Sequence, residues 1–552
     1  IMSIEDAKEI SKGTTLDCDV IIIGTGAAGT PCTCEFINSG KDVIVLESGG
    51  FEMDSATQAL AEGDVSSPSQ HGPLAQYRKR VFGGTTTVWG GRCSPFDEID
   101  FEKRAGIESS GWPIDRSALV PFYEKAHDYL HLGGFNYESA NSFADGDREI
   151  IPDLGKKSWS QNTLWRFSLP TDVGKENRQR LIDAPNVRVL LHANVTKLRT
   201  DATGAVMESV EVTSLEKNPF KVRARSVIVA AGGLESTRLL LASDDVHREG
   251  IGNENDLVGR YYCSHVSGDL GEVNFSPKAR NVLWQYEQTS DGIYSKRQLR
   301  PKESVMKEEG LLNIRCITTH PPFADASHRS GVLSSAYLAK RFFKGQIPPE
   351  YSKELAAAGY HSLPQHIRNV ILGTPSVIKF GTHWFFKRTI ARRKYPSISI
   401  RSRANAYTIH FDAEQSPNRD SRISLGDRRD DLGQRLLTVD WKYRSADFES
   451  VMRWRDLLCE DLKSGGVGHF RQNREEAEDI VRSGFGVGSH HIGTTRMSES
   501  PRDGVVDSDC QIHGVEGLFI AAPSVFPTAS FANPVLTTVA LGLRIADHVL
   551  KR

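Results

Sequence analysis

The stretch VIIIGTGAAG, residues 20–29, decides the fold, because a β-branched run leads directly into a glycine-rich turn. Residues 18–23 are predicted as a strand, and the small residues after the turn as the start of a helix. A second β-branched run follows at residues 42–47 and predicts the next strand. Together these segments predict a βαβ unit of the kind that binds dinucleotides.

The glycines of the turn have separate tasks in such a unit. Gly24 permits the tight turn, Gly26 leaves space for a pyrophosphate, and Gly29 lets the helix pack closely on the strand. Ala27 and Ala28 lie between them, where the helix N-terminus offers free N–H groups to phosphate oxygens. All five residues are therefore predicted to bind the nucleotide.

Glu47 closes the second strand, 18 residues after Gly29. A carboxylate at this place can accept hydrogen bonds from both ribose hydroxyls. The alternative is a strand-end charge on the protein surface. The βαβ unit alone does not distinguish NAD from FAD.

Two more apolar runs, residues 226–230 and 516–521, resemble the first strand although they lie far from it in the chain. The earlier run is followed by Ala231, a glycine turn and a predicted helix, so we expect Ala231 near the same nucleotide. Alternating strands and helices favour one sheet assembled from these distant segments.

The region 264–485 has a different pattern, with longer polar stretches and alternating strands such as residues 407–411 and 421–425. We interpret it as a second, inserted domain. Within it, HWFFKRTIARRK at residues 383–394 combines aromatic and basic side chains. A solvated helix face or a lid is one interpretation, and contact with a membrane surface or an anionic substrate is the other.

Composition narrows the class of protein. Hydrophobic residues make up 39% of the chain and charged residues 25%, as in ordinary globular proteins. The formal charge of −2 provides no general field for nucleic acids or anionic membranes. The sequence has no run of about 18 apolar residues and its first residues lack signal-peptide features, so we expect a cytoplasmic protein. The eight scattered cysteines argue against a zinc site or a disulfide framework, and we predict no metal site.

Several motifs spread along the chain resemble those of the glucose-methanol-choline (GMC) oxidoreductases. The resemblance runs from Asp19 to the C-terminus and is weaker between about residues 265 and 405. Besides the first βαβ unit with Glu47, it rests on residues 82–91 (FGGTTTVWGG), 111–114 (GWPI) with 119–123 (LVPFY), 252–260, 414–418 (EQSPN) and 490–533. It is closest to the pyranose oxidase and cellobiose dehydrogenase side of the family, because Asn533 stands where glucose oxidase-like members carry a second histidine.

The resemblance implies an α/β fold with a Rossmann-type FAD-binding domain and an inserted α+β substrate-binding domain built on an antiparallel sheet. The FAD-binding domain is expected at residues 15–263, with substrate-side segments embedded at about 95–180, and again at residues 486–552. The substrate-binding domain is expected mainly at residues 264–485.

The same resemblance implies FAD as the cofactor. Gly83 and Gly84 would let the backbone run against the isoalloxazine. In related oxidases a histidine of this tract is linked to the flavin, and Val88 stands at its position here, which implies FAD held without a covalent bond. Val195 resembles a residue whose backbone contacts adenine, with a place in a strand core as the alternative.

In the segment SHHIGTT the family's catalytic base corresponds to His490. An imidazole suits this task because its ordinary pKa lies near neutrality. Asn533 would orient the substrate hydroxyl by donating from its amide, or stabilise a turn before Pro534. His491 is expected to support or pack. Pro534 and Thr537 are expected near the flavin, with helix capping as the alternative for Thr537.

The implied reaction is oxidation of an alcohol carbon to a carbonyl by hydride transfer to flavin, on a secondary hydroxyl of a sugar, glycoside or cyclitol. Electrons would pass on to oxygen or another acceptor, and no nucleic-acid partner is expected. The alternatives are a flavin-containing lyase of the hydroxynitrile lyase type and an NAD-dependent dehydrogenase. An alcohol added without oxygen bleaches the flavin of an oxidoreductase but not of a lyase, and an NAD enzyme would be colourless.

Overall fold

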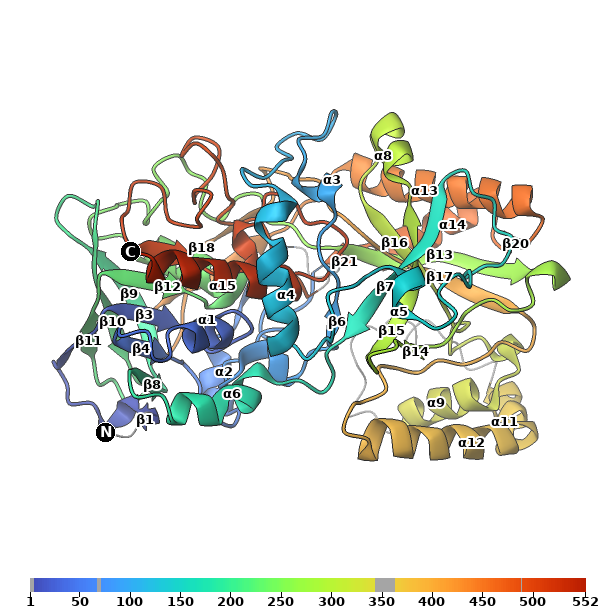
Figure 1. The fold of residues 1–552 in the computed structure, drawn as a ribbon, viewed down its shortest axis with the longest axis horizontal. Helices are drawn as coiled ribbons and strands as arrows, with labels where there is room; N and C mark the ends of the chain where they lie inside the picture. Colours follow the sequence, from blue (N-terminus) through green and yellow to red (C-terminus); the bar gives the residue numbers. More distant parts are fainter. Residues whose placement is uncertain (1–3, 67–70, 343–362, 488) are drawn as a thin grey trace.

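The computed structural model describes residues 4–66, 71–342, 363–487 and 489–552, and in it the chain forms two halves, each built on a large sheet (Figure 1). One half contains a parallel sheet and both labelled chain ends, and the other half contains an antiparallel sheet. The predicted fold class is therefore confirmed.

The parallel sheet has the strand order β1-β8-β4-β3-β12-β22, and each neighbouring pair is parallel. Its strands are β1 (Ile4–Asp6), β8 (Val187–Leu191), β4 (Val43–Leu46), β3 (Val20–Ile23), β12 (Ser226–Val229) and β22 (Leu518–Ile520). The four strands predicted from distant segments lie side by side as β4, β3, β12 and β22, so the prediction of one shared sheet is confirmed. All residues of β3, β4 and β22 are buried, as parallel sheets require.

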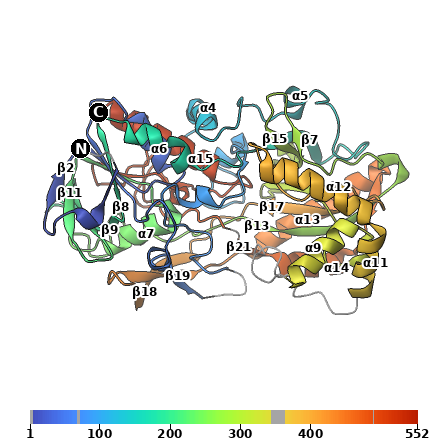
Figure 2. The same ribbon diagram turned by 90° about the horizontal axis from the view of Figure 1, so that it is seen from below.

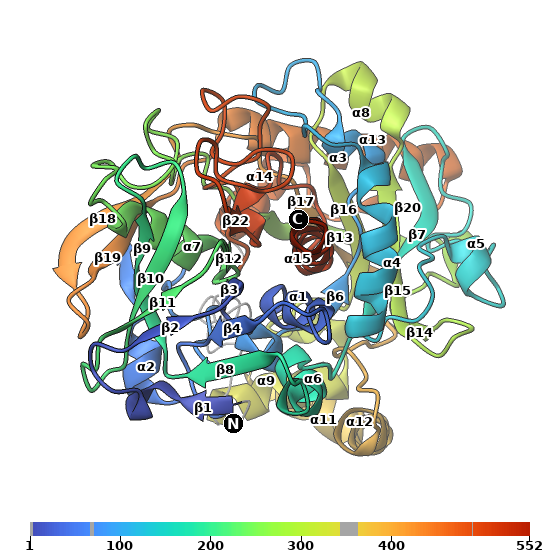
Figure 3. The same cartoon turned by 60° about the vertical axis from the view of Figure 1, so that its left-hand side comes forward.

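The last helix of the described chain packs against the first helix of the βαβ unit. These are α15 (Val535–Leu550) and α1 (Gly29–Glu35), and α4 (Val120–Tyr129) packs across α15 (Figure 3). A Cβ placed on Gly542 of α15 would lie 3.2 Å from the carbonyl oxygen of Ala28. The residues that precede α15 are thus held close to the glycine-rich turn.

Two smaller sheets belong to the half with the parallel sheet. One joins β2 (Thr15–Asp17), β11 (Phe220–Arg223), β10 (Met207–Thr213) and β9 (Asn194–Thr200), and the other joins β18 (Arg422–Arg429), β19 (Arg435–Asp440) and β5 (Gly63–Val65). The strand predicted at residues 421–425 is therefore present as β18, but its sheet is completed by a strand from the N-terminal region. Helix α7 (Gly232–Ala242) packs against β18 and β19.

The antiparallel sheet has the order β20-β13-β17-β16-β15-β7-β6, with β14 paired to β15 and β21 paired to β13. Its strands are β20 (Gly468–Phe470), β13 (Val266–Phe275), β17 (Ala406–Ala413), β16 (Ile314–Thr319), β15 (Tyr294–Pro301), β7 (Trp159–Phe167), β6 (Arg92–Cys93), β14 (Glu287–Gln288) and β21 (Gly486–Val487). The strand predicted at residues 407–411 is the inner strand β17. Strand β7 comes from the region expected to supply substrate-side segments, whereas the domain bounds themselves stay a prediction.

Helices lie on both sides of the antiparallel sheet (Figures 1 and 2). On one side are α13 (Ser445–Gly465) and α14 (Arg474–Gly484). On the other side are α9 (Gly331–Phe342), α11 (Leu363–Leu372) and α12 (Thr374–Trp384), which continues as a π-helix over Phe385–Ile390. The basic and aromatic segment 383–394 thus begins in α12. No helix of the described ranges is long and apolar enough to cross a membrane, and the cytoplasmic location stays a prediction.

Candidate active site

His490 lies where three segments of the chain meet. It follows β21, and the nearby Ile492 forms a β-bridge with Cys263, just before β13. Nδ1 of His490 is 2.9 Å from Nδ1 of His265, and Nε2 of His490 is 3.2 Å from Nδ2 of Asn533. The structure thus brings His490 and Asn533, the two residues predicted to be catalytic, close together. It also places His265 beside His490, and the sequence did not predict this contact.

The hydrogen bonds of this group assign the position of each proton. Nε2 of His265 is 3.0 Å from the carbonyl oxygen of Ala529, which can only accept, so this nitrogen carries the hydrogen. In the neutral ring Nδ1 of His265 is then an acceptor, and Nδ1–H of His490 donates to it. Nε2 of His490 is left with its lone pair, toward which the Asn533 amide donates. The basic nitrogen of His490 therefore lies on the side of Asn533.

Both imidazoles are held in the neutral form. Burial lowers the pKa of His265 to about 4. Burial also lowers the pKa of His490 well below its ordinary value, and the neighbouring His265 and His491 lower it further. A neutral imidazole is what a base needs before it accepts a proton.

His491 belongs to a different group on the opposite side of the same segment. Its ring stacks at 6.5 Å from the ring of His71 and at 6.3 Å from that of Tyr262. His71 and Tyr262 are joined by a hydrogen bond of 2.7 Å between Nε2 and the hydroxyl. A Cβ on Gly233 would collide with the carbonyl of His491, so the segment fits tightly against the start of α7.

The loop that carries Asn533 is fixed by a buried carboxylic acid. The hydroxyl of Ser530 is 2.6 Å from Oδ2 of Asp100, and the hydroxyl of Thr528 donates to the Asp100 carbonyl at 2.8 Å. Burial, and next the charge of Asp97, raise the pKa of Asp100 to about 7. These contacts hold the backbone from Thr528 to Asn533 in place, including Ser530 with its positive φ of 54°.

The glycine-rich turn has the shape of a cradle for a diphosphate. Gly24 has φ of 102°, and a Cβ on it would lie 2.8 Å from the carbonyl oxygen of Ala230. A Cβ on Gly29 would collide with the carbonyl of Gly24. Around Gly26, by contrast, a Cβ would meet no atom within 4 Å, so its backbone faces open space. The residues present therefore fit a bound dinucleotide at Gly26.

A second glycine tract packs against this turn. Gly83 has φ of 93° and donates its N–H to the Thr25 hydroxyl at 3.2 Å. A Cβ on Gly84 would lie 2.9 Å from Cα of Gly26. The tract predicted to run along the isoalloxazine is thus directly beside the predicted diphosphate site.

Glu47 lies at the end of β4 and is only 4% exposed. The alternative of a surface charge is therefore wrong. One carboxylate oxygen accepts from the amide and the hydroxyl of Thr25 at 2.9 and 2.6 Å, and the other accepts from the amide of Gly49 at 2.8 Å. Burial raises the pKa of Glu47, while these donors oppose that shift. Glu47 orders the glycine-rich turn, and its contact with ribose stays a prediction.

The other predicted cofactor contacts lie around the same end of the parallel sheet. Ala231 precedes α7, and Val195 lies on β9, paired with Val212 of β10. Val88 ends the short helix of the second glycine tract and is 55% exposed. Ala27 and Ala28 lie in the turn before α1.

Pro534 precedes the first residue of α15, and no side chain caps the helix there. The Thr537 hydroxyl is 2.9 Å from that of Tyr123, so the capping alternative for Thr537 is wrong. The first amide that bonds back into the helix is that of Thr538, to Pro534 at 2.8 Å. The earlier amides of α15 are those that a helix leaves free for a ligand.

Residues 417–542 match the protein family described as GMC oxidoreductase, and they include His490 and Asn533. The chain is also 22% identical to paromamine 6'-oxidase of Streptomyces fradiae, over 96% of this chain and 91% of that protein. The chain is thus similar to the GMC oxidoreductases. It is therefore an enzyme of the oxidoreductase class.

Other relatives of the chain also match over nearly their full lengths. The chain is 21% identical to 2-methyl-1,2-propanediol dehydrogenase of Mycolicibacterium austroafricanum, over 97% of this chain and 95% of that protein. It is 22% identical to the fructose dehydrogenase large subunit of Gluconobacter japonicus, over 97% of this chain and 98% of that protein. The structure of a fungal aryl-alcohol oxidase shares the fold, with a TM-score of 0.53 and 15% identity over 97% of this chain and 99% of that one.

The sheet face near His490 carries positive charge. The guanidinium groups of Arg92 and Arg315 lie 5.3 and 3.5 Å from the ring centroid of Trp165 on β7. Arg315 forms an ion pair with Asp412, but its Nε and Nη1 are buried without hydrogen-bond partners. The charges of Arg92 and Arg315 contribute to the lowered pKa of His490.

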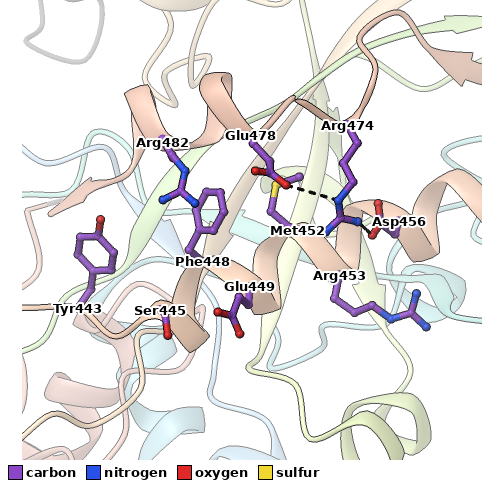
Figure 4. A pocket seen from close by; sticks show the side chains of 10 residues that line it. All are labelled: Tyr443, Ser445, Phe448, Glu449, Met452, Arg453, Asp456, Arg474, Glu478 and Arg482. Atoms are coloured by element: carbon purple, nitrogen blue, oxygen red, sulfur yellow. Dashed lines mark hydrogen bonds and ion pairs between the residues drawn. The ribbon is translucent and has the colours of Figure 1, made fainter. Parts of the chain in front are cut away.

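A surface hollow of about 560 Å³ between α13 and α14 shares no residue with this site (Figure 4). Inside it Arg474 forms ion pairs with Asp456 and Glu478, and Arg482 lies 3.8 Å over the ring of Phe448. The charge of Arg474 is thus paired within the hollow.

Proposed function

We propose that this protein is an FAD-dependent oxidoreductase that oxidises an alcohol carbon to a carbonyl, on a secondary hydroxyl of a sugar, glycoside or cyclitol. The observation that carries the proposal is the group of Ala529, His265, His490 and Asn533, which leaves one basic nitrogen beside one amide donor. Alcohol oxidation removes a proton from the hydroxyl group and a hydride from the carbon that carries it. It therefore needs a base that takes the proton and a donor that holds the oxygen.

The residues that would hold FAD are those of the two glycine tracts, Glu47, and the free amides at the start of α15. When bound, FAD supplies the acceptor for the hydride. The open space at Gly26 accepts the diphosphate, and the first amides of α15 are suited to a polar or negative edge of the ring system.

His490 and Asn533 act on the same substrate hydroxyl group. His490 acts on its hydrogen, and Asn533 acts on its oxygen. In the substrate complex the hydroxyl replaces the Asn533 amide as the donor to Nε2 of His490, which takes the proton as the C–H bond breaks. The Asn533 amide donates to the substrate oxygen and stabilises the negative charge that develops there without competing for the proton. His265 keeps the other nitrogen of His490 protonated, so the lone pair remains on the side of the substrate.

The substrate class is supported by what the relatives are named for, which includes paromamine, fructose and a propanediol. The test is addition of sugars, glycosides and cyclitols to the purified holoenzyme without oxygen, with the flavin absorbance recorded. Bleaching by at least one member of the panel is the expected result. A flavin that stays oxidised with all of them, while a hydroxynitrile is cleaved, would establish the lyase alternative. Peroxide detection after admission of air then distinguishes oxygen from other acceptors.

FAD is proposed to be held without a covalent bond, because Val88 has no nucleophilic side chain. Acid precipitation should release all of the flavin into the supernatant. Flavin in the pellet would overturn this and would require another attachment residue. Cys93, the nearest cysteine, is 1% exposed and its pKa is raised by burial, so its thiolate is poorly available.

A further inference from the structure

The exposed apolar side chains of this protein are concentrated in one segment. Among the described residues, thirteen large hydrophobic side chains are exposed, and seven of them lie between residues 367 and 390. These are Ile367, Ile371, Leu372, Ile378, Phe385, Phe386 and Ile390, with exposed fractions from 45% to 69%. A cluster of this kind on a globular protein marks a contact with another apolar body.

The charge of the same region is strongly one-sided. Residues 355–411 contain nine Lys and Arg but no Asp or Glu, in a chain whose formal charge is −2. Arg368, Lys379, Lys387 and Arg392 are exposed, and none forms an ion pair with a carboxylate of the described ranges. The surface therefore offers positive charge, without a carboxylate partner among the described residues, directly beside apolar side chains.

The segment is firmly attached to the rest of the molecule. Tyr395, which follows it, is buried and packs edge-on against Tyr286 and Tyr294 at 5.4 and 5.3 Å. Nη1 of Arg388 donates to the Tyr395 carbonyl at 2.7 Å, and Nη2 of Arg393 donates to the carbonyl of His131 at 3.0 Å. In Figures 1 and 2 the helices lie on the outer flank of the antiparallel sheet. The surface is thus presented outward on a fixed base.

We propose that α11, α12 and the π-helix Phe385–Ile390 form a membrane-contact surface that lies in the interface of a bilayer containing anionic lipids. The apolar side chains enter the region below the headgroups, and the lysines and arginines pair with lipid phosphates. The helices lie on the bilayer and do not span it, since none is long and apolar enough.

Charge complementarity selects the bilayer over a second copy of the chain. Two copies meeting through this surface would bring like charges together, because the segment has no carboxylate to pair with the lysines and arginines of its partner. An anionic bilayer provides both the apolar interior and the negative charge. The inference does not depend on the proposed reaction.

The test is co-sedimentation of the holoenzyme with vesicles, either of phosphatidylcholine alone or with about 30% phosphatidylglycerol. We expect binding to the anionic vesicles at least about tenfold tighter than to the neutral ones, and weaker in about 0.5 M salt. The variant I378S/F385S/F386S should lose at least about tenfold in binding, and K379E/K387E should do the same on anionic vesicles.

Matched controls use exposed residues from other parts of the surface. V206S/V246S removes apolar side chains that are 41% and 44% exposed, and K103E/K175E removes exposed lysines. Both should bind vesicles like the unchanged protein, and all four variants should keep their flavin and their rate of flavin reduction.

Three results would overturn the proposal. They are failure of the unchanged protein to bind anionic vesicles, equal binding by I378S/F385S/F386S, and equal loss in the control variants. Lipid-free dimerisation that is abolished by I378S/F385S/F386S, without vesicle binding, would assign the surface to a second copy instead.

Discussion

His490 and His491 are adjacent in sequence, yet they belong to two regions with different chemistry. The region around His490 is a chain of directed hydrogen bonds through His265 and Asn533. The region around His491 consists of stacked rings, His71 and Tyr262, and within the described ranges no side chain forms a hydrogen bond with the ring of His491. Burial lowers the pKa of both histidines, so the pKa alone would not separate them. The two histidines therefore differ in the direction of their hydrogen bonds and not in the direction of their pKa shifts, and this difference supports His490 as the proposed base.

The largest effect should come from His490→Ala. Loss of a general base typically costs about 100- to 10,000-fold, so anaerobic flavin reduction should slow by at least about 100-fold with FAD still bound. Stopped-flow absorbance on protein of verified flavin content measures this. A near-normal rate of flavin reduction in this variant would contradict the proposal that His490, and not His491, is the base.

Asn533→Ala should slow flavin reduction by about 100-fold, because the developing negative charge on the substrate oxygen loses its donor. Asn533→Asp keeps the size of the side chain but removes the donor, and should be at least as slow. An Asp variant that retains the full rate would show that the amide serves only the turn before Pro534.

His265→Phe should slow flavin reduction by about fivefold, since one hydrogen bond of roughly 1 kcal/mol no longer fixes the proton on Nδ1 of His490. His265→Gln can both accept from His490 and donate to the Ala529 carbonyl, so it should recover most of the rate. Equal losses in the Phe and Gln variants would reduce His265 to a packing role.

His491→Ala should slow flavin reduction by less than about threefold. The free energy of unfolding should fall instead, by about 0.5–1.5 kcal/mol for each lost ring contact. Unfolding in urea measures this. A severe loss of rate in this variant, with His490→Ala nearly normal, would shift the assignment of the base by one residue.

The smallest effect on the rate of flavin reduction should come from lowering the pH from 8 to 6. Because the pKa of His490 is well below its ordinary value and that of His265 is about 4, both rings stay neutral from pH 8 to pH 6 and the reduction rate should be flat there. In the unfolded chain these rings take up protons below about pH 6.5. Their contribution to stability should therefore be lost as the pH falls below that value. A rate that falls about fourfold between pH 8 and pH 6 would show that the base titrates at its ordinary pKa of about 6.5.

The sequence predicts best what depends on neighbouring residues. The turn from Gly24 to Gly29 was predictable because steric rules act within a few residues, and the burial of β3 follows from its apolar run. The contact between His265 and His490 joins positions 225 residues apart, and that between Asp100 and Ser530 joins positions 430 apart. No spacing rule reaches so far, so these supporting residues could be found only in the folded chain.

The same reasoning explains the partner of β18. Alternation of side chains predicts a strand at residues 421–425, but it does not say which strand lies beside it. In the fold its sheet is completed by β5, from the first part of the chain. Pairing across such distances is decided by how whole sheets pack.

The packing of α15 on α1 has a consequence for biosynthesis. Strand β22 completes the edge of the parallel sheet, and Asn533 and α15 follow it near the end of the described chain. During translation the N-terminal βαβ unit leaves the ribosome long before the strand and helix that cover it. The glycine-rich turn therefore stays uncovered until α15 has been made, and a nascent chain should be aggregation-prone and in need of chaperones until then.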